Sequence, residues 1–174
     1  MRSLTALSLV LALGLAAPAA QAHVTLETGE AAANSFVKFV LRVPHGCEGK
    51  ATTSVRVRVP EGVINAKPMP KAGWTLEAVR GAYGKSYDYY GSTLTEGVVE
   101  IVWSGGELPD AFYDEFVFRA KVTDFPVGTV LALPVVQECG SEAAERWIEV
   151  PEAGKSADDY DFPAPTLTII EGGH

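Results

Sequence analysis

The chain lacks most of the sequence signatures by which enzymes are recognised. Its 174 residues contain no G-x-S-x-G or H-E-x-x-H motif, no phosphate-binding glycine loop and no G-x-G-x-x-G that opens a helix. Histidine is scarce as well, since only His23, His45 and His174 are present. A serine triad would have to use His45, and nothing places a serine beside it. We therefore expect a binding protein and not an enzyme.

Residues 1–22 have the features of a secretory signal peptide. Arg2 supplies a positive n-region, residues 4–17 an apolar h-region, and the A-Q-A triplet at residues 20–22 a cleavage site. The apolar run is shorter than the roughly 20 residues that a membrane span needs. A cut after residue 19 is the alternative, but it places a proline in the middle of the site. Cleavage after Ala22 predicts an exported protein, periplasmic or extracellular, whose mature chain begins at His23.

Basic residues are in short supply. The chain has 14 Lys and Arg against 22 Asp and Glu, a formal net charge of −8 at pH 7, and loss of Arg2 with the leader makes it −9. Such a surface repels the phosphates of nucleic acids and anionic lipid headgroups. We therefore expect no nucleic-acid partner, and contact with a membrane only through export or a neighbouring protein.

Long amphipathic helices are absent from the pattern, and the body of the chain has a hydrophobic period of two. The segments SFVKFVLRV at residues 35–43 and TSVRVRV at residues 53–59 alternate apolar with polar or outward positions. Eight to ten such short strands, separated by Gly- and Pro-rich turns, predict an all-β, immunoglobulin- or fibronectin-III-like antiparallel β-sandwich of two sheets. We assign this domain to residues 23–170, with residues 152–164 as a loop before the last strand and residues 171–174 as a tail.

Only two cysteines occur, Cys47 and Cys139. An even number in an exported chain favours one disulfide, and the alternative, a thiolate metal site, lacks C-x-x-C spacing. The hairpin after residue 135 is expected to place Cys139 opposite Trp147. Because bridged Cα atoms lie within about 7 Å, a disulfide would bring the loop that carries His45 and Glu48 next to Trp147.

His23 has unusual chemistry if the leader is removed, because its α-amine is then free. That amine has a pKa of about 7.7 to 8.0, so a metal can displace its proton near neutral pH. One residue thus offers two nitrogen ligands, a donor set that suits copper(II). The alternative is that histidine follows the leader by chance.

Several segments together resemble one known family. HVTLE, LRVPHGCEG, TTSVRVRVPEGV, KPMPKAGWTLE, VWSGG, YDEFVFRAKV and RWIEV, in this order over residues 23 to about 151, are similar to the YcnI-like exported copper-binding domains, also described as a domain of unknown function of the DUF1775 type. The resemblance implies a β-sandwich with a one-histidine brace for copper(II) at His23, a nearby carboxylate and a tryptophan, here Trp147. Glu48 is the best match for the carboxylate, and His45 is a rival ligand.

Other candidates are expected to lie away from the metal. Glu27 is four residues from His23, about 13 Å along a strand, so both could scarcely bind one ion. Glu138 and Glu149 neighbour Cys139 and Trp147, and adjacent strand residues point to opposite faces. Trp74 and Trp103 are expected in the core, and His174 in the tail.

The sequence thus predicts an exported copper(II)-binding protein in copper trafficking or homeostasis, metallochaperone-like and without turnover. Its partners would be the copper ion and another periplasmic copper chaperone. Two alternatives stay open: a copper oxidase of the polysaccharide monooxygenase type, and an immunoglobulin-like module that binds a partner without metal.

Overall fold

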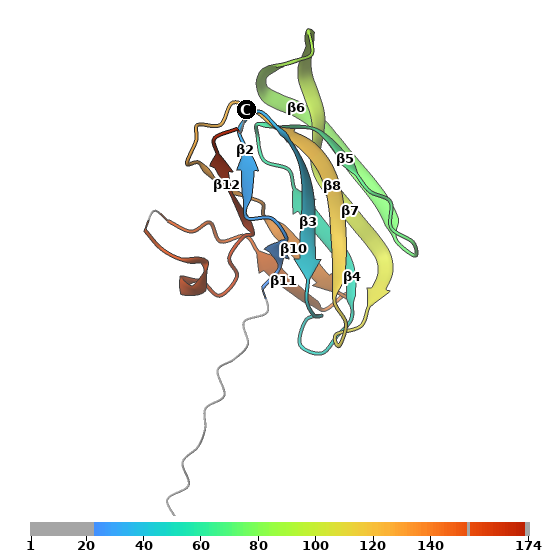
Figure 1. Ribbon diagram of the computed structural model, residues 1–174. Helices are drawn as coiled ribbons and strands as arrows, with labels where there is room; N and C mark the ends of the chain where they lie inside the picture. The colour runs from blue at the N-terminus through green and yellow to red at the C-terminus, as the bar shows by residue number, and fades with distance from the viewer. Residues whose placement is uncertain (1–22, 153, 173–174) are drawn as a thin grey trace, which may run out of the picture.

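The computed structural model describes residues 23–152 and 154–172 (Figure 1). The signal peptide and residues 173–174 of the tail lie outside this range. The described part contains twelve strands and one 3-10 turn: β1 (Thr25–Leu26), β2 (Glu30–Ala32), β3 (Phe36–Val43), β4 (Thr52–Arg58), β5 (Val63–Pro68), β6 (Thr75–Tyr89), β7 (Ser92–Leu108), β8 (Asp114–Val122), β9 (Val130–Ala132), β10 (Val135–Cys139), β11 (Ala143–Trp147), η1 (Ala157–Asp159) and β12 (Thr166–Ile170).

The strands form a β-sandwich, as the period-two pattern predicts. One sheet has the order β1-β3-β8-β5 and the other β11-β10-β4-β7-β6. A third, small sheet of β2-β12-β9 was not expected, and in it β12 runs parallel to β2. The strands also number more than ten, and β6 and β7 are 15 and 17 residues long, so they are not short. Their hairpin extends beyond the rest of the body at one end of the molecule (Figure 1).

The core lies between the two large sheets and is built from the alternating residues of their strands. In β3, Phe39 and Leu41 are buried, and Phe39 stacks on Phe118 of β8 with 4.6 Å between ring centroids. In β4, Val55 and Val57 are buried while Arg56 and Arg58 point outward. These faces are the ones that the sequence pattern assigns to the core.

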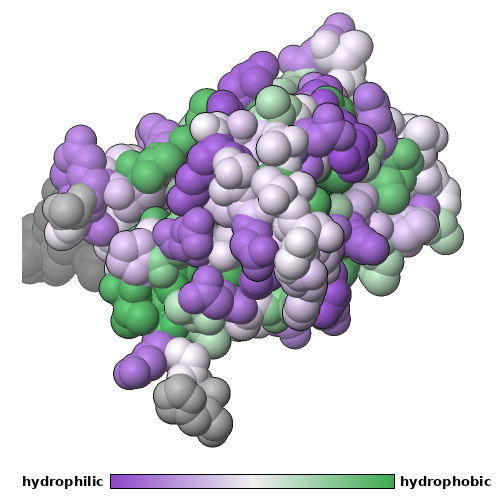
Figure 2. All heavy atoms as spheres, turned by 90° about the horizontal axis from the view of Figure 1, so that it is seen from above, coloured by the Kyte–Doolittle hydropathy of each residue, from purple (hydrophilic) through white to green (hydrophobic). Residues whose placement is uncertain are grey.

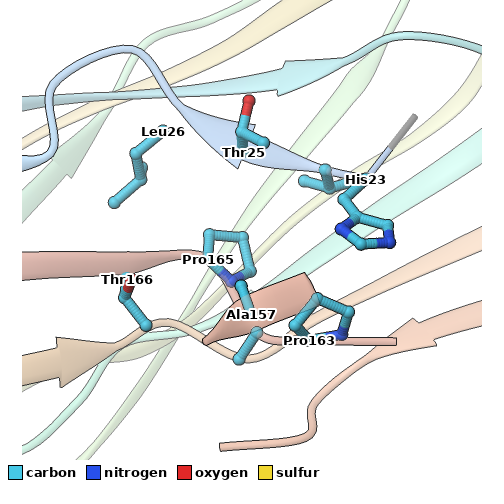
Figure 3. Close-up of a pocket in the computed structure, with 9 residues that line it drawn as sticks. His23, Thr25, Leu26, Ala157, Pro163, Pro165 and Thr166 are labelled. Carbon is cyan, nitrogen blue, oxygen red and sulfur yellow. The ribbon is translucent and has the colours of Figure 1, made fainter. Parts of the chain in front are cut away.

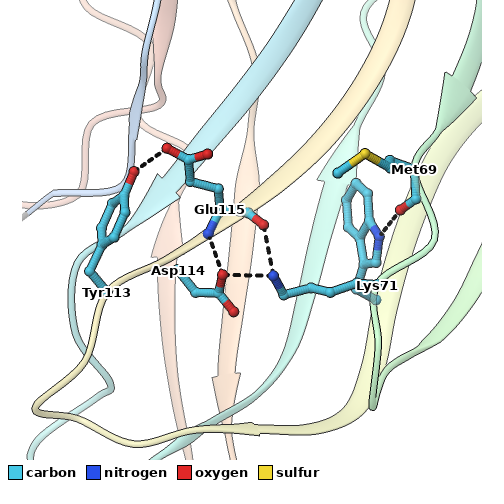
Figure 4. Close-up of polar contacts among 6 residues, drawn as sticks. Met69, Lys71, Tyr113, Asp114 and Glu115 are labelled. Atoms are coloured by element: carbon cyan, nitrogen blue, oxygen red, sulfur yellow. Dashed lines mark hydrogen bonds and ion pairs between the residues drawn. The ribbon is translucent and has the colours of Figure 1, made fainter.

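Polar contacts fasten the loop between β5 and β6 to β8 (Figure 4). The Lys71 Nζ donates to Asp114 Oδ1 at 2.7 Å and to the Glu115 carbonyl at 3.0 Å. The indole N–H of Trp103 donates to the Met69 carbonyl at 3.0 Å. Trp74 packs edge-on against Phe116, so this end of the sandwich is closed by aromatic side chains.

One face of the domain is mainly polar (Figure 2). Seen from above, hydrophilic side chains cover most of the surface, and apolar ones show only in separate areas (Figure 2). In residues 23–152 and 154–172 we find no helix long and apolar enough to cross a membrane.

Candidate metal centre

His23 lies beside Trp147. The histidine immediately precedes Val24 and β1, and Trp147 is the last residue of β11, with 4% of its surface exposed. Their ring centroids are 5.4 Å apart, with the ring planes tilted by 53°. The structure therefore brings together two residues that are 124 positions apart in the chain and that the sequence analysis placed at one site.

A small cavity opens next to the His23 imidazole (Figure 3). Its volume is about 160 Å³, and it contains no charged side chain: its walls come from His23, Val24, Thr25, Leu26, Ala157, Pro163, Ala164, Pro165 and Thr166. Pockets for drug-sized molecules usually enclose about 300–1,000 Å³. The space at His23 is thus too small for a drug-sized molecule, and its walls are mainly apolar.

The other side of the site is fixed by the segment between β11 and β12. Phe162 packs against Trp147 with 5.3 Å between ring centroids. The backbone N–H of Phe162 donates to the Glu149 carboxylate at 2.6 Å, and the N–H of Glu149 donates to the Phe162 carbonyl at 3.1 Å. Glu149 therefore anchors this segment, in keeping with its expected place away from the metal.

A disulfide joins Cys47 to Cys139, as predicted, with 5.8 Å between the Cα atoms. It ties the loop between β3 and β4 to the end of β10. The strand register differs from our expectation, because Cys139 pairs with Ala143 and Trp147 pairs with Val135. The connection between β10 and β11 is three residues long, too short to place Cys139 opposite Trp147.

Glu48 and His45 occupy different positions in this loop. Glu48 is exposed at the tip of a turn closed by Cys47 and Lys50, with a positive φ of 50°. His45 is half-buried, and its Nδ1 is hydrogen-bonded to the Gly46 carbonyl oxygen. The His45 backbone carbonyl accepts a hydrogen bond from Gln137, which in turn accepts one from the Trp147 indole.

Glu145 is the carboxylate that our sequence analysis missed. It lies on β11 two residues before Trp147, and it lines a cavity of about 230 Å³ together with Glu48, Glu142 and Phe162. Its Oε2 is buried, and among the described residues it has no hydrogen-bond partner. The signal was available: strand residues two apart share a face, so Glu145 must point to the same side as Trp147.

The electrostatics around Glu145 raise the pKa of its carboxyl group. Burial is the main cause, and the nearby carboxylates of Glu48 and Asp110 add to it, while His45 opposes it. These groups come from three different loops and strands. A cation bound here would offset the cost of burying the carboxylate, because it stabilises the charged form.

The remaining candidates are accounted for by other contacts. Glu27 forms an ion pair with Arg42 at 3.7 Å on the surface. Trp103 is buried and Trp74 packs against the core, both as expected. His174 lies outside the described residues.

The site residues fall into two groups. The first group is His23 with Trp147, and the second is His45 with Glu48 and Glu145. Phe162 lies between the groups, because it packs against Trp147 and also lines the cavity of the two glutamates. Within residues 23–152 and 154–172, no three His, Cys, Asp or Glu side chains converge on one point as metal ligands do. The donor types present, imidazole nitrogen and carboxylate oxygen, are ones that copper(II) accepts, but they are divided between the two groups.

Comparison with known proteins agrees with this architecture. An uncharacterized protein from Nocardia farcinica, whose crystal structure has an immunoglobulin-like fold, is 26% identical over 85% of this chain and 98% of its own, with a TM-score of 0.62. No curated protein matches the sequence. Residues 23–169 match the family described as "Domain of unknown function (DUF1775)". The chain therefore belongs to the DUF1775 family.

Proposed function

We propose that this domain is an exported copper(II)-binding protein of the YcnI-like type, with a role in copper trafficking or homeostasis. The observation that carries the proposal is the placement of His23, the residue after the predicted cut, 5.4 Å from the nearly buried ring of Trp147. The family match also starts at residue 23, which agrees with a mature domain that begins there.

Copper is the cargo in this proposal, and His23 is its main binding residue. The α-amine and the imidazole of one N-terminal histidine supply two nitrogen ligands, and nitrogen donors favour copper(II). Binding needs the amine without its proton, which the low pKa of an α-amine makes possible near neutral pH. The Trp147 ring covers one side of His23 and limits the approach of water there.

A carboxylate completes the proposed donor set, and Glu145 is our first choice. It lies on the same strand face as Trp147, and its buried oxygen lacks a hydrogen-bond partner among the described residues. Glu48 and His45 are the rivals, since they lie on the loop that the disulfide holds beside this strand. Glu48 is exposed at a turn tip, so binding through it would require less desolvation but more ordering of the side chain.

The proposed cycle is binding and release without turnover, with exchange of copper with a second exported chaperone. A copper oxidase is the competing interpretation, and it would need a second imidazole on the metal, for which His45 is the one candidate. Peroxide formation with ascorbate distinguishes the two. We expect the copper-loaded protein to form less peroxide than the same amount of copper in buffer.

The α-amine provides the sharpest test. An extension of four alanines ahead of His23 converts the amine into an amide and moves the new α-amine out of chelate range of the imidazole, while the imidazole and the net charge stay nearly the same. A single added residue would instead create a new chelate of amine, amide and imidazole. Copper(II) affinity of the extended form should fall by two or more orders of magnitude at pH 7, and His23→Ala should do at least as much damage. Competition titration measures this, with each N-terminus checked by mass spectrometry. Equal affinities for the cut and extended forms would rule out the brace.

A further inference from the structure

Gln137 is a polar residue in the middle of an apolar row. It is 0% exposed on β10, between the buried Val135 and Cys139 on the same strand face. A buried amide is costly unless its hydrogen bonds are made, and leucine or methionine would fill a similar volume without that cost. The presence of glutamine here therefore calls for a reason other than packing.

The amide of Gln137 joins two parts of the candidate metal centre. Its Oε1 accepts a hydrogen bond from the Trp147 indole N–H at 3.1 Å. Its Nε2 donates to the His45 carbonyl at 2.7 Å and to Thr52 Oγ1 at 2.7 Å. The side chain thus connects the residue that packs on His23 with the backbone of the loop that carries His45 and Glu48.

The two neighbours dictate the chemistry of the residue between them. An indole N–H can only donate and a backbone carbonyl can only accept, so the connecting group must accept and donate at once. An ionised carboxylate has no proton to donate to His45, and an ammonium group has no lone pair for Trp147. Of the side chains long enough for this position, a glutamine amide meets both requirements without a charge.

We propose that Gln137 is the positioning residue of the metal centre, which holds the Trp147 ring against His23 and fixes the His45 loop to the same strand. The inference rests on the proposed function and deepens it. The disulfide at Cys139, two residues along β10, anchors the same loop from its other side. Gln137 therefore sets the separation of the two groups of candidate ligands, although it touches no metal itself.

Gln137→Met is the first test, with Thr52→Val as the matched control. Methionine keeps the volume and removes all the amide hydrogen bonds. Thr52→Val removes one acceptor of Gln137 and the longer 3.5 Å contact of the Thr52 hydroxyl with the His45 carbonyl, but it leaves the Gln137 bonds to Trp147 and His45 in place. Both substitutions lower stability. Only Gln137→Met should weaken copper(II) binding, by about 10-fold to 100-fold, as substitutions of residues that orient metal ligands commonly do. The copper(II) EPR spectrum of this variant should also broaden into a mixture of geometries.

A readout without metal separates this inference from the proposed function. The Trp147 ring should shift the NMR signals of the His23 imidazole protons in the metal-free mature protein. Gln137→Met should move these signals toward their values in an unstructured peptide, and Thr52→Val should leave them in place. If the wild type shows the shift but binds no copper(II), the proposed function fails while the positioning role of Gln137 stands.

Gln137→Glu covers the case in which the methionine variant does not fold. Burial and the neighbouring Glu145 raise the pKa of the new carboxyl group, so the measurement is made above that pKa. There the ionised glutamate still accepts from Trp147 but cannot donate to His45, so the His23 signals should keep their shift while amide exchange at residues 46–50 speeds up. Unchanged His23 signals together with unchanged copper affinity in a folded Gln137→Met protein would overturn the proposal. Unchanged amide exchange in Gln137→Glu would overturn the link to the His45 loop.

Discussion

Two buried tryptophans, three strands apart on the same sheet, illustrate how differently two regions of this sandwich are built. Trp103 on β7 and Trp147 on β11 are 0% and 4% exposed, and both indole N–H groups donate a hydrogen bond. The acceptor of Trp103 is a backbone carbonyl, and its ring packs on Phe116 of the core. The acceptor of Trp147 is the Gln137 side chain, and its ring packs on His23. Burial alone therefore does not distinguish a core tryptophan from one at a site, whereas its partners do.

The charged groups near the two tryptophans differ in the same way. In the region of Trp103, the ammonium group of Lys71 donates to the Asp114 carboxylate and to the Glu115 carbonyl. On the strand of Trp147, the Glu145 carboxylate has a buried oxygen that no described residue satisfies. Natural proteins keep such unfavourable groups mainly where function requires them. Under the proposed function, the region around Trp147 is the part of this domain in which stability and metal binding compete.

Loss of the disulfide should have the largest effect, because the bridge closes a long stretch of the chain and holds the loop of His45 and Glu48 beside β10. The Cys47→Ser, Cys139→Ser double variant opens a loop with a sequence separation of 92. The chain-entropy model gives a loss of about 4–5 kcal/mol in the free energy of unfolding. Denaturant titration measures this loss. Copper affinity should fall too, and a folded double variant with full affinity would show that the bridge has a structural role only.

Replacement of each tryptophan by phenylalanine tests the comparison directly. Both variants lose a buried indole hydrogen bond and ring volume, so each should be destabilised by about 1–3 kcal/mol. Copper(II) should quench part of the fluorescence of the wild type, and Trp147→Phe should remove most of that quenching while Trp74 and Trp103 still emit. Trp103→Phe should leave the copper-dependent change intact. Equal fractional quenching in Trp147→Phe would assign Trp147 to the core.

The sequence predicted those parts of the fold that follow from local periodicity. Alternation in residues 35–43 and 53–59 predicts β3 and β4 with the correct inward faces, and the even number of cysteines predicts the disulfide. The parallel pairing of β12 with β2 could not be predicted, because it joins residues about 138 positions apart through tertiary contacts alone. The lengths of β6 and β7 were also missed, since their glycines indicate turns where the structure has a long twisted hairpin.

The candidate site was predicted less completely than the fold. The proximity of His23 and Trp147 agrees with the resemblance, and their role as metal-binding residues stays a prediction. Gln137 escaped notice because it ends an apolar run and looks like the first outward residue after it. Glu145 was missed although the alternation argument applied to Glu138 and Glu149 covers it as well. A period-two pattern assigns polar residues to the outer face, so it cannot predict a polar residue on the inner face of a strand.

Glu145→Gln should have the smallest effect on stability. Unlike the other variants, it should raise the stability of the metal-free protein. Burial raises the pKa of Glu145 in the folded protein, so the ionised group destabilises the metal-free fold above that pKa. Below the pKa of the unfolded chain both states are protonated, and the penalty vanishes. The glutamine variant without metal should therefore melt at a slightly higher temperature at pH 7, by less than about 3 °C, and the difference should disappear near pH 4.

Copper(II) should reverse the order of the melting temperatures of the wild type and Glu145→Gln. An amide is a weaker ligand than a carboxylate and brings no charge to offset that of the metal, so Glu145→Gln should bind copper(II) about 10-fold more weakly or worse. Thermal melts of both proteins at pH 7 and pH 4, with and without copper, measure both effects in one experiment. If the variant is less stable at pH 7 and keeps full affinity for copper(II), Glu145 supports the fold, as Lys71 does in the region of Trp103. Gain of stability with loss of copper binding would instead identify the Glu145 carboxylate as a group retained for the metal.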